Sequence, residues 1–112
     1  MKKPIIIESN LVPKRFCVNI FGTLWIADKS RINPFLINHE RIHTAQMRET
    51  LFVPFYILYF FEWLFRLVQY RNWFEAYKNI SFEREAYANG NDLEYLHNRK
   101  AFSWLKWIKM AQ

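Results

Sequence analysis

Glycine, proline and cysteine are all scarce in this chain. Its 112 residues include two glycines, four prolines and a single cysteine, Cys17. A fold with many tight turns needs more glycine and proline, so the composition disfavours an extensive sheet and favours helices. A single cysteine cannot form an internal disulfide, which agrees with an intracellular protein without requiring one.

Runs of like charge are also absent, although the formal net charge is +6 and the pI is about 9.6. The basic residues are scattered among apolar ones, so the sequence does not favour nucleic-acid binding. The apolar patch at residues 5–7 is ended by Glu8 and is too short for the core of a signal peptide. We therefore expect a cytoplasmic protein, either free or peripheral to a membrane.

Apolar residues are plentiful: they make up 52% of the chain, and aromatic residues make up 20%. This is enough for the core of one domain spanning residues 1–112. Residues 4–7, 16–21 and 23–27 are rich in β-branched and aromatic side chains and predict three short antiparallel strands. These strands would form either a lid over the helices or an edge with which an extended peptide can pair.

Helices are predicted for most of the remaining chain. Asn33 and Pro34 indicate a cap and a first turn, and the helix that they begin must end or kink before Pro54. The helices predicted from such signals cover residues 34–50, residues 82–89 with Ser81 as cap and Gly90 as the end, a further stretch through Asn98 with Asp92 as cap, and residues 101–110. The predicted fold class is therefore α+β, mainly α, with N-terminal strands followed by a helical bundle.

Leu51–Val68 is the longest apolar segment. Its uncharged N-terminal part is about half the length needed to cross a bilayer, and Glu62 and Arg66 follow. These two charges are four residues apart and can pair on one face of a helix. We expect a central buried helix; the alternatives are a helix at a membrane interface and a helix that forms a homo-oligomer. Trp104 and Trp107 in the last segment likewise fit either a docked helix or an interfacial anchor.

The segment His39-Glu40-Arg41-Ile42-His43 carries the main functional signal. On a helix, residues four apart lie on the same face, so His39 and His43 can direct two imidazoles at one metal ion. Glu40 lies one step around the helix, where it can hold a metal-activated water without displacing either ligand. A chain of this composition would contain such an HExxH pattern by chance in about four cases in a thousand. The pattern predicts a zinc site with Glu40 as general base.

A catalytic zinc usually has three protein ligands and one water, so a third ligand is needed. The predicted helix after Ser81 carries Glu83 and Glu85, which are two residues apart and therefore lie on different sides of it. Only one of them can face the metal, and the spacing alone does not decide which. Acids in the first turn of a helix also stabilise its dipole, which is the alternative role for both.

Taken together, the two motifs resemble those of gluzincin-type zinc metallopeptidases, particularly the single-domain ones. In that clan the third ligand is a Glu on a second helix, in a motif often written ExxxD or ExEAD. The match of Glu83-x-Glu85-Ala86 to this motif implies that Glu83 is the third ligand in a single zincin-like domain. Tyr87 stands where the clan often has an Asp that orients the first histidine, so the Tyr87 oxygen, Asn19, Asp28 or a backbone carbonyl must replace it. The whole chain is also similar to a group of short bacterial proteins of unassigned function.

The resemblance implies hydrolysis of a peptide or protein substrate with one zinc ion. Zinc would activate a water and polarise the scissile carbonyl, while Glu40 would carry the proton to the leaving nitrogen. Tyr77, Tyr87 and His97 are candidates, by residue type, for stabilising the oxyanion or supporting the ligands. The alternative is a non-catalytic, metal-stabilised interaction module, oligomeric or at a membrane surface, because so short a chain leaves little for the far wall of a substrate cleft.

Overall fold

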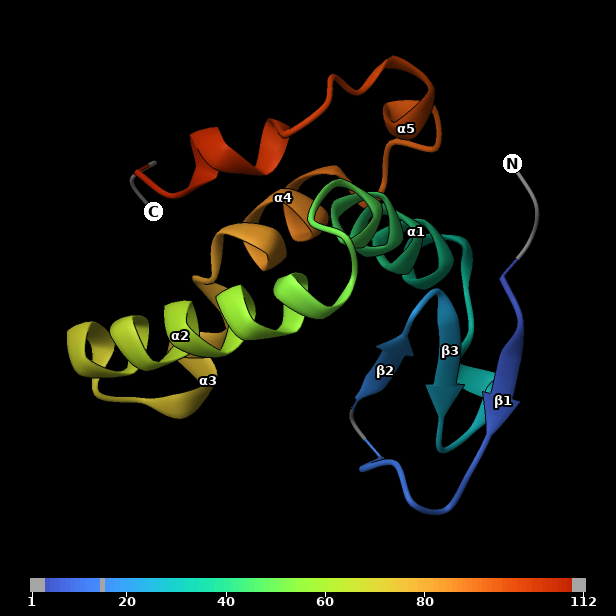
Figure 1. Ribbon diagram of the computed structural model, residues 1–112. Coiled ribbons are helices and arrows are strands. Elements are labelled where there is room, and N and C mark those ends of the chain that lie inside the picture. Colours follow the sequence, from blue (N-terminus) through green and yellow to red (C-terminus); the bar gives the residue numbers. More distant parts are fainter. Residues whose placement is uncertain (1–3, 15, 110–112) are drawn as a thin grey trace.

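The computed structural model describes residues 4–14 and 16–109, so Met110 of the predicted last helix lies outside the described residues (Figure 1). A small sheet lies at one end of the molecule and the helices make up the rest, which confirms the mainly helical α+β fold. The sheet contains β1 (Ile6–Glu8), β2 (Cys17–Ile20) and β3 (Thr23–Ile26), in the order β1-β3-β2.

The middle strand of this sheet is β3, which is antiparallel to β2, as predicted, and parallel to β1. The prediction of antiparallel pairing is therefore wrong for the β1–β3 pair. Its physical reason is that the chain reverses direction twice, between β1 and β2 and again between β2 and β3. The arrangement leaves β2 at an edge of the sheet, next to the helices.

The helix that carries the HExxH motif is α1 (Pro34–Glu49). Its start is capped as predicted, because the Asn33 side chain accepts a hydrogen bond of 2.8 Å from the Leu36 amide. It ends where Leu51 and Phe52 adopt positive φ angles of 63° and 66°, a conformation that bulky side chains rarely take. The next helix, α2 (Val53–Tyr70), leaves at 110° to α1.

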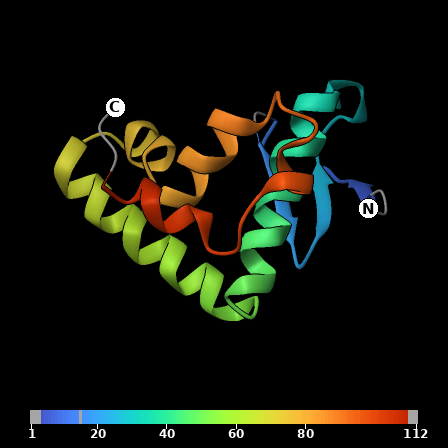
Figure 2. The same ribbon diagram turned by 90° about the horizontal axis from the view of Figure 1, so that it is seen from above.

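Although α2 is the most apolar helix of the chain, it lies at the periphery in both views (Figures 1 and 2). Its buried residues are Phe55 and Arg66, and the structure describes the whole helix. The prediction of a central buried helix is therefore wrong, because neighbouring elements cover only one side of it. The opposite side exposes a continuous set of large apolar residues, which we call the apolar face of α2: Val53, Ile57, Leu58, Phe60, Phe61, Leu64, Phe65 and Val68.

The two charges of α2 point toward the protein instead. Glu62 and Arg66 approach to 3.4 Å, and Arg66 Nη2 donates to the carbonyl of Ile108 at 2.7 Å. Glu62 also accepts hydrogen bonds from the amide and the hydroxyl of Ser81, at 2.7 and 2.6 Å. The helix therefore has its charged groups inside and its apolar groups outside, the reverse of the usual arrangement.

Two short helices follow α2: α3 (Trp73–Lys78) and α4 (Ser81–Asn89). Ser81 was predicted to cap α4, but it is the first residue of that helix. The cap position is held by Ile80, whose apolar side chain cannot accept a hydrogen bond from the helix. This prediction is wrong because Glu62, from α2, satisfies the free amide of Ser81 from outside the local sequence.

The remaining elements are short. They are the 3-10 helix η1 (Lys29–Arg31), the single turn α5 (Tyr95–Asn98) and the 3-10 helix η2 (Ser103–Trp107). Trp104 of η2 is buried, with its ring 4.6 Å from that of Phe82, so it packs in the core and is no membrane anchor. Met47, Phe55 and Ile80 complete this cluster.

No single helix in the described part of the chain is both long and apolar enough to cross a membrane. Together, α1 and α2 satisfy the length and composition requirements, but the pair is bent by 110° at the break between them.

Candidate metal centre

The two histidines of the HExxH motif lie one turn apart on α1 and point in the same direction. Their Nε2 atoms are 3.2 Å apart, and both side chains are buried. This is the geometry expected for residues four positions apart on a helix. The ring of Phe55, from α2, packs near His43 and closes one side of the pair.

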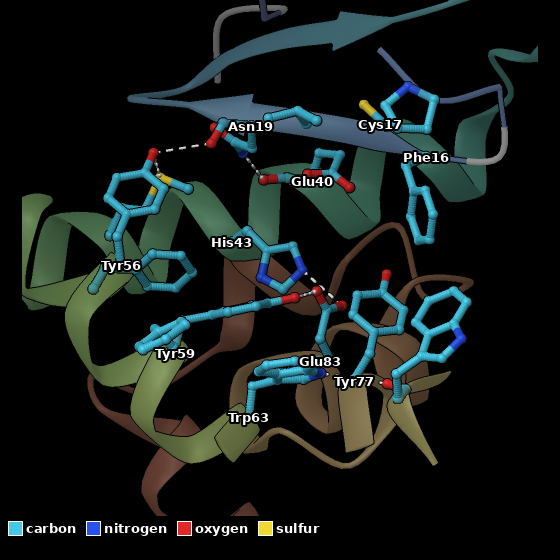
Figure 3. A pocket seen from close by; sticks show the side chains of 16 residues that line it. Phe16, Cys17, Asn19, Glu40, His43, Tyr56, Tyr59, Trp63, Tyr77 and Glu83 are labelled. Atoms are coloured by element: carbon cyan, nitrogen blue, oxygen red, sulfur yellow. Dashed lines mark hydrogen bonds and ion pairs between the residues drawn. The ribbon is translucent and has the colours of Figure 1, made fainter. Parts of the chain in front are cut away.

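Glu83 reaches the histidines from α4. Its Oε1 atom lies 3.1 Å from Nε2 of His39 and 3.0 Å from Nε2 of His43, as Figure 3 shows for His43. Its other oxygen accepts a hydrogen bond of 2.5 Å from the hydroxyl of Tyr59, on α2. Three donor atoms from two helices thus converge on one point, and a third helix holds the carboxylate in place.

Glu40 lies beside this point without touching it. Its Oε2 atom is 3.9 Å from Nε2 of His39, and its side chain is buried. Burial raises the pKa of Glu40 to about 7, and the charge of Glu83 adds to this effect while that of His43 opposes it. Its backbone carbonyl accepts a hydrogen bond of 2.9 Å from Asn19, which ties β2 to α1 at the site.

The cluster of His39, Glu40 and His43 could hold a metal ion, because one ligand atom of each lies within 4.8 Å of the others. Glu83 comes closer to both imidazoles than Glu40 does. Two ligands that are bound to a tetrahedral zinc at 2.0–2.1 Å lie about 3.3 Å apart. The separations of 3.0–3.2 Å among His39, His43 and Glu83 are close to that value.

A chain of hydrogen bonds orients His43 from behind. Its Nδ1 atom lies 2.8 Å from Oε1 of Gln46, whose Nε2 donates to Glu85 at 2.9 Å and to the carbonyl of Phe82 at 3.0 Å. Since the amide nitrogen of Gln46 is the donor in those bonds, its oxygen accepts, and Nδ1 of His43 must carry a proton. The lone pair of a neutral His43 is then on Nε2, where a metal would need it.

Glu85, the other candidate ligand, points away from the histidines. It is fully buried and accepts hydrogen bonds from Arg99 Nε at 2.6 Å, from Gln46 and from the hydroxyl of Tyr95. Arg99 also bonds to Glu49 at the end of α1. Glu85 therefore anchors the support of His43 and is not placed to contact a shared metal.

The charges of the cluster act on one another. Burial alone would lower the pKa of His43, but the carboxylate of Glu83 raises it to about 9. Burial alone would raise the pKa of Glu83, but His43 and His39 hold it well below its usual range. Burial lowers the pKa of His39 despite its hydrogen bond with Glu83. Glu83 and His43 therefore each favour the charged form of the other.

The expected support for His39 is not made by the side chains that the sequence suggested. Asn19 bonds to the Glu40 carbonyl, and Asp28 accepts from the Ser30 amide. The Tyr87 ring packs against that of His39 at 4.5 Å, but its hydroxyl bonds to Tyr77. Nδ1 of His39 makes no hydrogen bond of normal geometry with any described residue, although the backbone of Ala86 is near enough to raise its pKa.

Two of the three polar candidates lie at the site. The hydroxyls of Tyr77 and Tyr87 are 3.0 Å apart, and both residues line a cavity of about 550 Å³ together with His39 and Glu40. His97 is not brought to the site: it is exposed on α5 and lines a different depression with Asn38.

A second cavity, of about 480 Å³, adjoins the first at Glu40 and Tyr77 (Figure 3). Glu40, His43 and Glu83 line it together with Cys17, whose pKa burial raises to about 12, so the thiol is no nucleophile at neutral pH. The rest of its lining is almost entirely apolar and aromatic: Pro13, Phe16, Val18, Asn19, Met47, Phe55, Tyr56, Tyr59, Phe60, Trp63, Trp73 and Tyr77.

Sequence reasoning missed Tyr59 at the site, and it placed Gln46 near the site without assigning it a role. Tyr59 lies in a run of aromatic residues in α2, and nothing local distinguishes it from those that only pack. Gln46 lies three residues after His43, on the same helix, and this spacing could have indicated that it supports the histidine.

Gly90 ends α4 as predicted, and its lack of a side chain also makes room for the site. A Cβ atom at this position would lie 2.5 and 2.9 Å from atoms of the Phe35 ring, which packs on His39.

We expect Gly90→Ala to lower the free energy of unfolding by about 1–3 kcal/mol, as overpacking does. Denaturant titration measures this. Asn91→Ala, an exposed neighbour, should change stability by no more than about 0.5 kcal/mol; equal stability of both variants would contradict the prediction.

Comparisons with protein-family models, with curated proteins and with solved structures give no match to this chain. The resemblance to gluzincins therefore stays a hypothesis that the two motifs carry.

Proposed function

We propose that this protein is a zinc-dependent metallopeptidase with one zinc ion held by His39, His43 and Glu83. The observation that carries the proposal is the convergence of three buried donor atoms from α1 and α4 at separations of 3.0–3.2 Å. Two imidazoles and one carboxylate form a ligand set typical of catalytic zinc. The hydrogen bond from Gln46 to His43 and the one from Tyr59 to Glu83 support it, because such outer contacts fix the ligands in place.

Glu40 is the proposed general base. When bound, zinc lowers the pKa of a water and polarises a carbonyl. Oε2 of Glu40 lies 3.9 Å from Nε2 of His39, whereas Oε1 of Glu83 lies 3.1 Å from it, so Glu40 stands beside the cluster and is not one of its closest donors. From this place its carboxylate could accept a proton from the water and return it to the leaving nitrogen.

The tyrosines beside His39 are the proposed donors to the developing oxyanion. Burial raises the pKa of Tyr77 and that of Tyr87 above their usual range, so both hydroxyls stay protonated. They line the cavity next to His39 and Glu40, where a scissile carbonyl would lie.

An extended peptide is the proposed substrate. The outer edge of β2 lies over the cluster, since Asn19 joins this strand to the Glu40 carbonyl, and a peptide could pair with it as an added strand. Side chains of such a peptide would enter the cavity lined by Phe16, Tyr56 and Trp63. This lining favours substrates with a large apolar residue next to the cleaved bond.

The second candidate function is a non-catalytic, metal-stabilised interaction module. The deep burial of all three donors favours it, because a closed metal site joins helices without reacting. The two candidates differ in whether the metal keeps a position open for water.

A metal analysis tests the proposed zinc site. We expect close to one zinc per chain after reconstitution and dialysis of the purified protein, and almost none in His39→Ala. His97→Ala is the matched control and should keep its zinc, because His97 is exposed and lies on α5. Zinc-free parent protein, or equal loss in both variants, would contradict the assignment. A peptide library under zinc-replete conditions then separates the peptidase from the module.

A further inference from the structure

The apolar face of α2 has no partner among the described residues. It lies at the periphery of the molecule, while η2 and α4 lie on the inner side of the helix (Figure 2). Phe61 and Phe65 are each 62% exposed, which is unusual for rings at the centre of a helix. A contiguous apolar surface of this kind marks a site of interaction.

Exposed basic side chains lie beyond both ends of this face. Within residues 48–78 and 103–109, all of which the structure describes, Glu75 is the one exposed acid. The exposed basic residues there are Arg48, Arg71, Lys78, Lys106 and Lys109. Arg48 and Arg71 lie beyond the two ends of α2, and Lys78 ends α3, which packs against α2. Lys106 and Lys109 flank Ile108, whose carbonyl bonds to Arg66 on the inner side of α2.

An apolar centre with a basic border suits an anionic lipid bilayer. Apolar side chains enter the boundary between headgroups and acyl chains, and arginine and lysine remain among the phosphates. The border also includes Trp73, which is exposed beside α2, and tryptophan favours this boundary. We propose that the apolar face of α2 docks on the surface of an anionic bilayer, with the helix lying in the plane of that surface.

A second copy of the chain fits the same face less well. Antiparallel pairing of two α2 helices would bring Arg48 of one copy near Arg71 of the other, and parallel pairing would bring like residues together. Both arrangements place positive charges side by side, which opposes association. An anionic surface meets the same charges with the opposite sign.

The proposal does not depend on the metal centre, but it would place that centre near the membrane. Phe60 belongs to the apolar face and also lines the cavity of about 480 Å³. The cavity therefore opens next to the proposed bilayer surface.

Cosedimentation of the purified full chain with lipid vesicles tests the proposal. We expect binding to vesicles of phosphatidylcholine with phosphatidylglycerol, weaker binding to phosphatidylcholine alone, and release from the anionic vesicles as salt increases. Replacing both Phe61 and Phe65 by serine should weaken binding about tenfold or more per ring. Arg71→Gln and Lys78→Gln should each weaken it about fivefold.

The controls lie elsewhere on the surface. Leu93→Ser removes an apolar side chain of matched exposure, 63%, and Lys29→Gln removes a charge at the sheet end of the molecule, so both should bind like the parent. Circular dichroism and thermal melting verify that each variant is folded. Failure of the parent to bind anionic vesicles at low salt would overturn the proposal. Normal vesicle binding by the double serine variant would also overturn it. So would light scattering that shows a dimer for the parent and the control variants and a monomer for the double serine variant.

Discussion

Glu40→Gln should reduce peptide hydrolysis by about 10²–10⁴-fold while leaving the zinc content unchanged. This is the range that general-base catalysis contributes, and the amide removes the basicity of Glu40 while keeping its shape. The side chain is buried and its carboxylate is not among the donors closest to the imidazoles, so neither the metal site nor the fold should depend on its charge. The measurements are kcat/KM for a peptide from the library, zinc per chain and the thermal midpoint.

Glu94→Gln is the matched control, because Glu94 is exposed and lies in the loop before α5. It should have the activity of the parent. Loss of zinc in Glu40→Gln would mean that the metal is held by His39, Glu40 and His43, and the general-base assignment would then be wrong. Full activity of the Glu40 variant would exclude the proposed chemistry.

Glu83→Gln should mainly reduce zinc affinity, whereas Glu85→Gln should mainly reduce the stability of the fold. Removing a residue that only supports a ligand lowers metal affinity by about 10–100-fold. Glu83→Gln removes a proposed ligand itself, so its loss of zinc affinity should be larger. Glu85→Gln should keep a measurable zinc site but lower the free energy of unfolding by about 1–3 kcal/mol, because it weakens the buried, charge-assisted hydrogen bonds between Glu85 and Arg99 while Glu49 still pairs with Arg99. Isothermal titration with zinc and denaturant unfolding separate these effects.

Tyr59→Phe completes the series. It removes only the hydroxyl that holds Glu83, so its zinc affinity should lie between that of the parent and that of Glu83→Gln. If Glu85→Gln abolished zinc binding in a folded protein and Glu83→Gln preserved it, the third ligand would be misplaced by two residues.

The parts of this structure that the sequence predicted depend on local signals. Asn33 caps α1, Pro54 prevents α1 from continuing, and the HExxH spacing brings His39 and His43 together. Each of these follows from backbone geometry within one or two turns. The downstream Glu helix was also located, although its contact with the histidines spans 40 residues or more.

The errors arose where distant groups decide the outcome. The amide of Ser81 is capped by Glu62, nineteen residues earlier, and no local pattern indicates such a cap. The support of His43 passes through Gln46 and Glu85 to Arg99, a path that joins three separate segments. Composition showed that α2 is apolar, but it cannot show which side of a helix the rest of the chain will cover.

The segment from Tyr95 to Ile108 has a consequence for the order in which the protein folds during synthesis. Arg99 neutralises Glu85, Trp104 packs on Phe82, and the Ile108 carbonyl accepts from Arg66. Arg99, Trp104 and Ile108 are all synthesised after the helices that they stabilise. A chain emerging from the ribosome would therefore expose both motif helices before this part of their support exists.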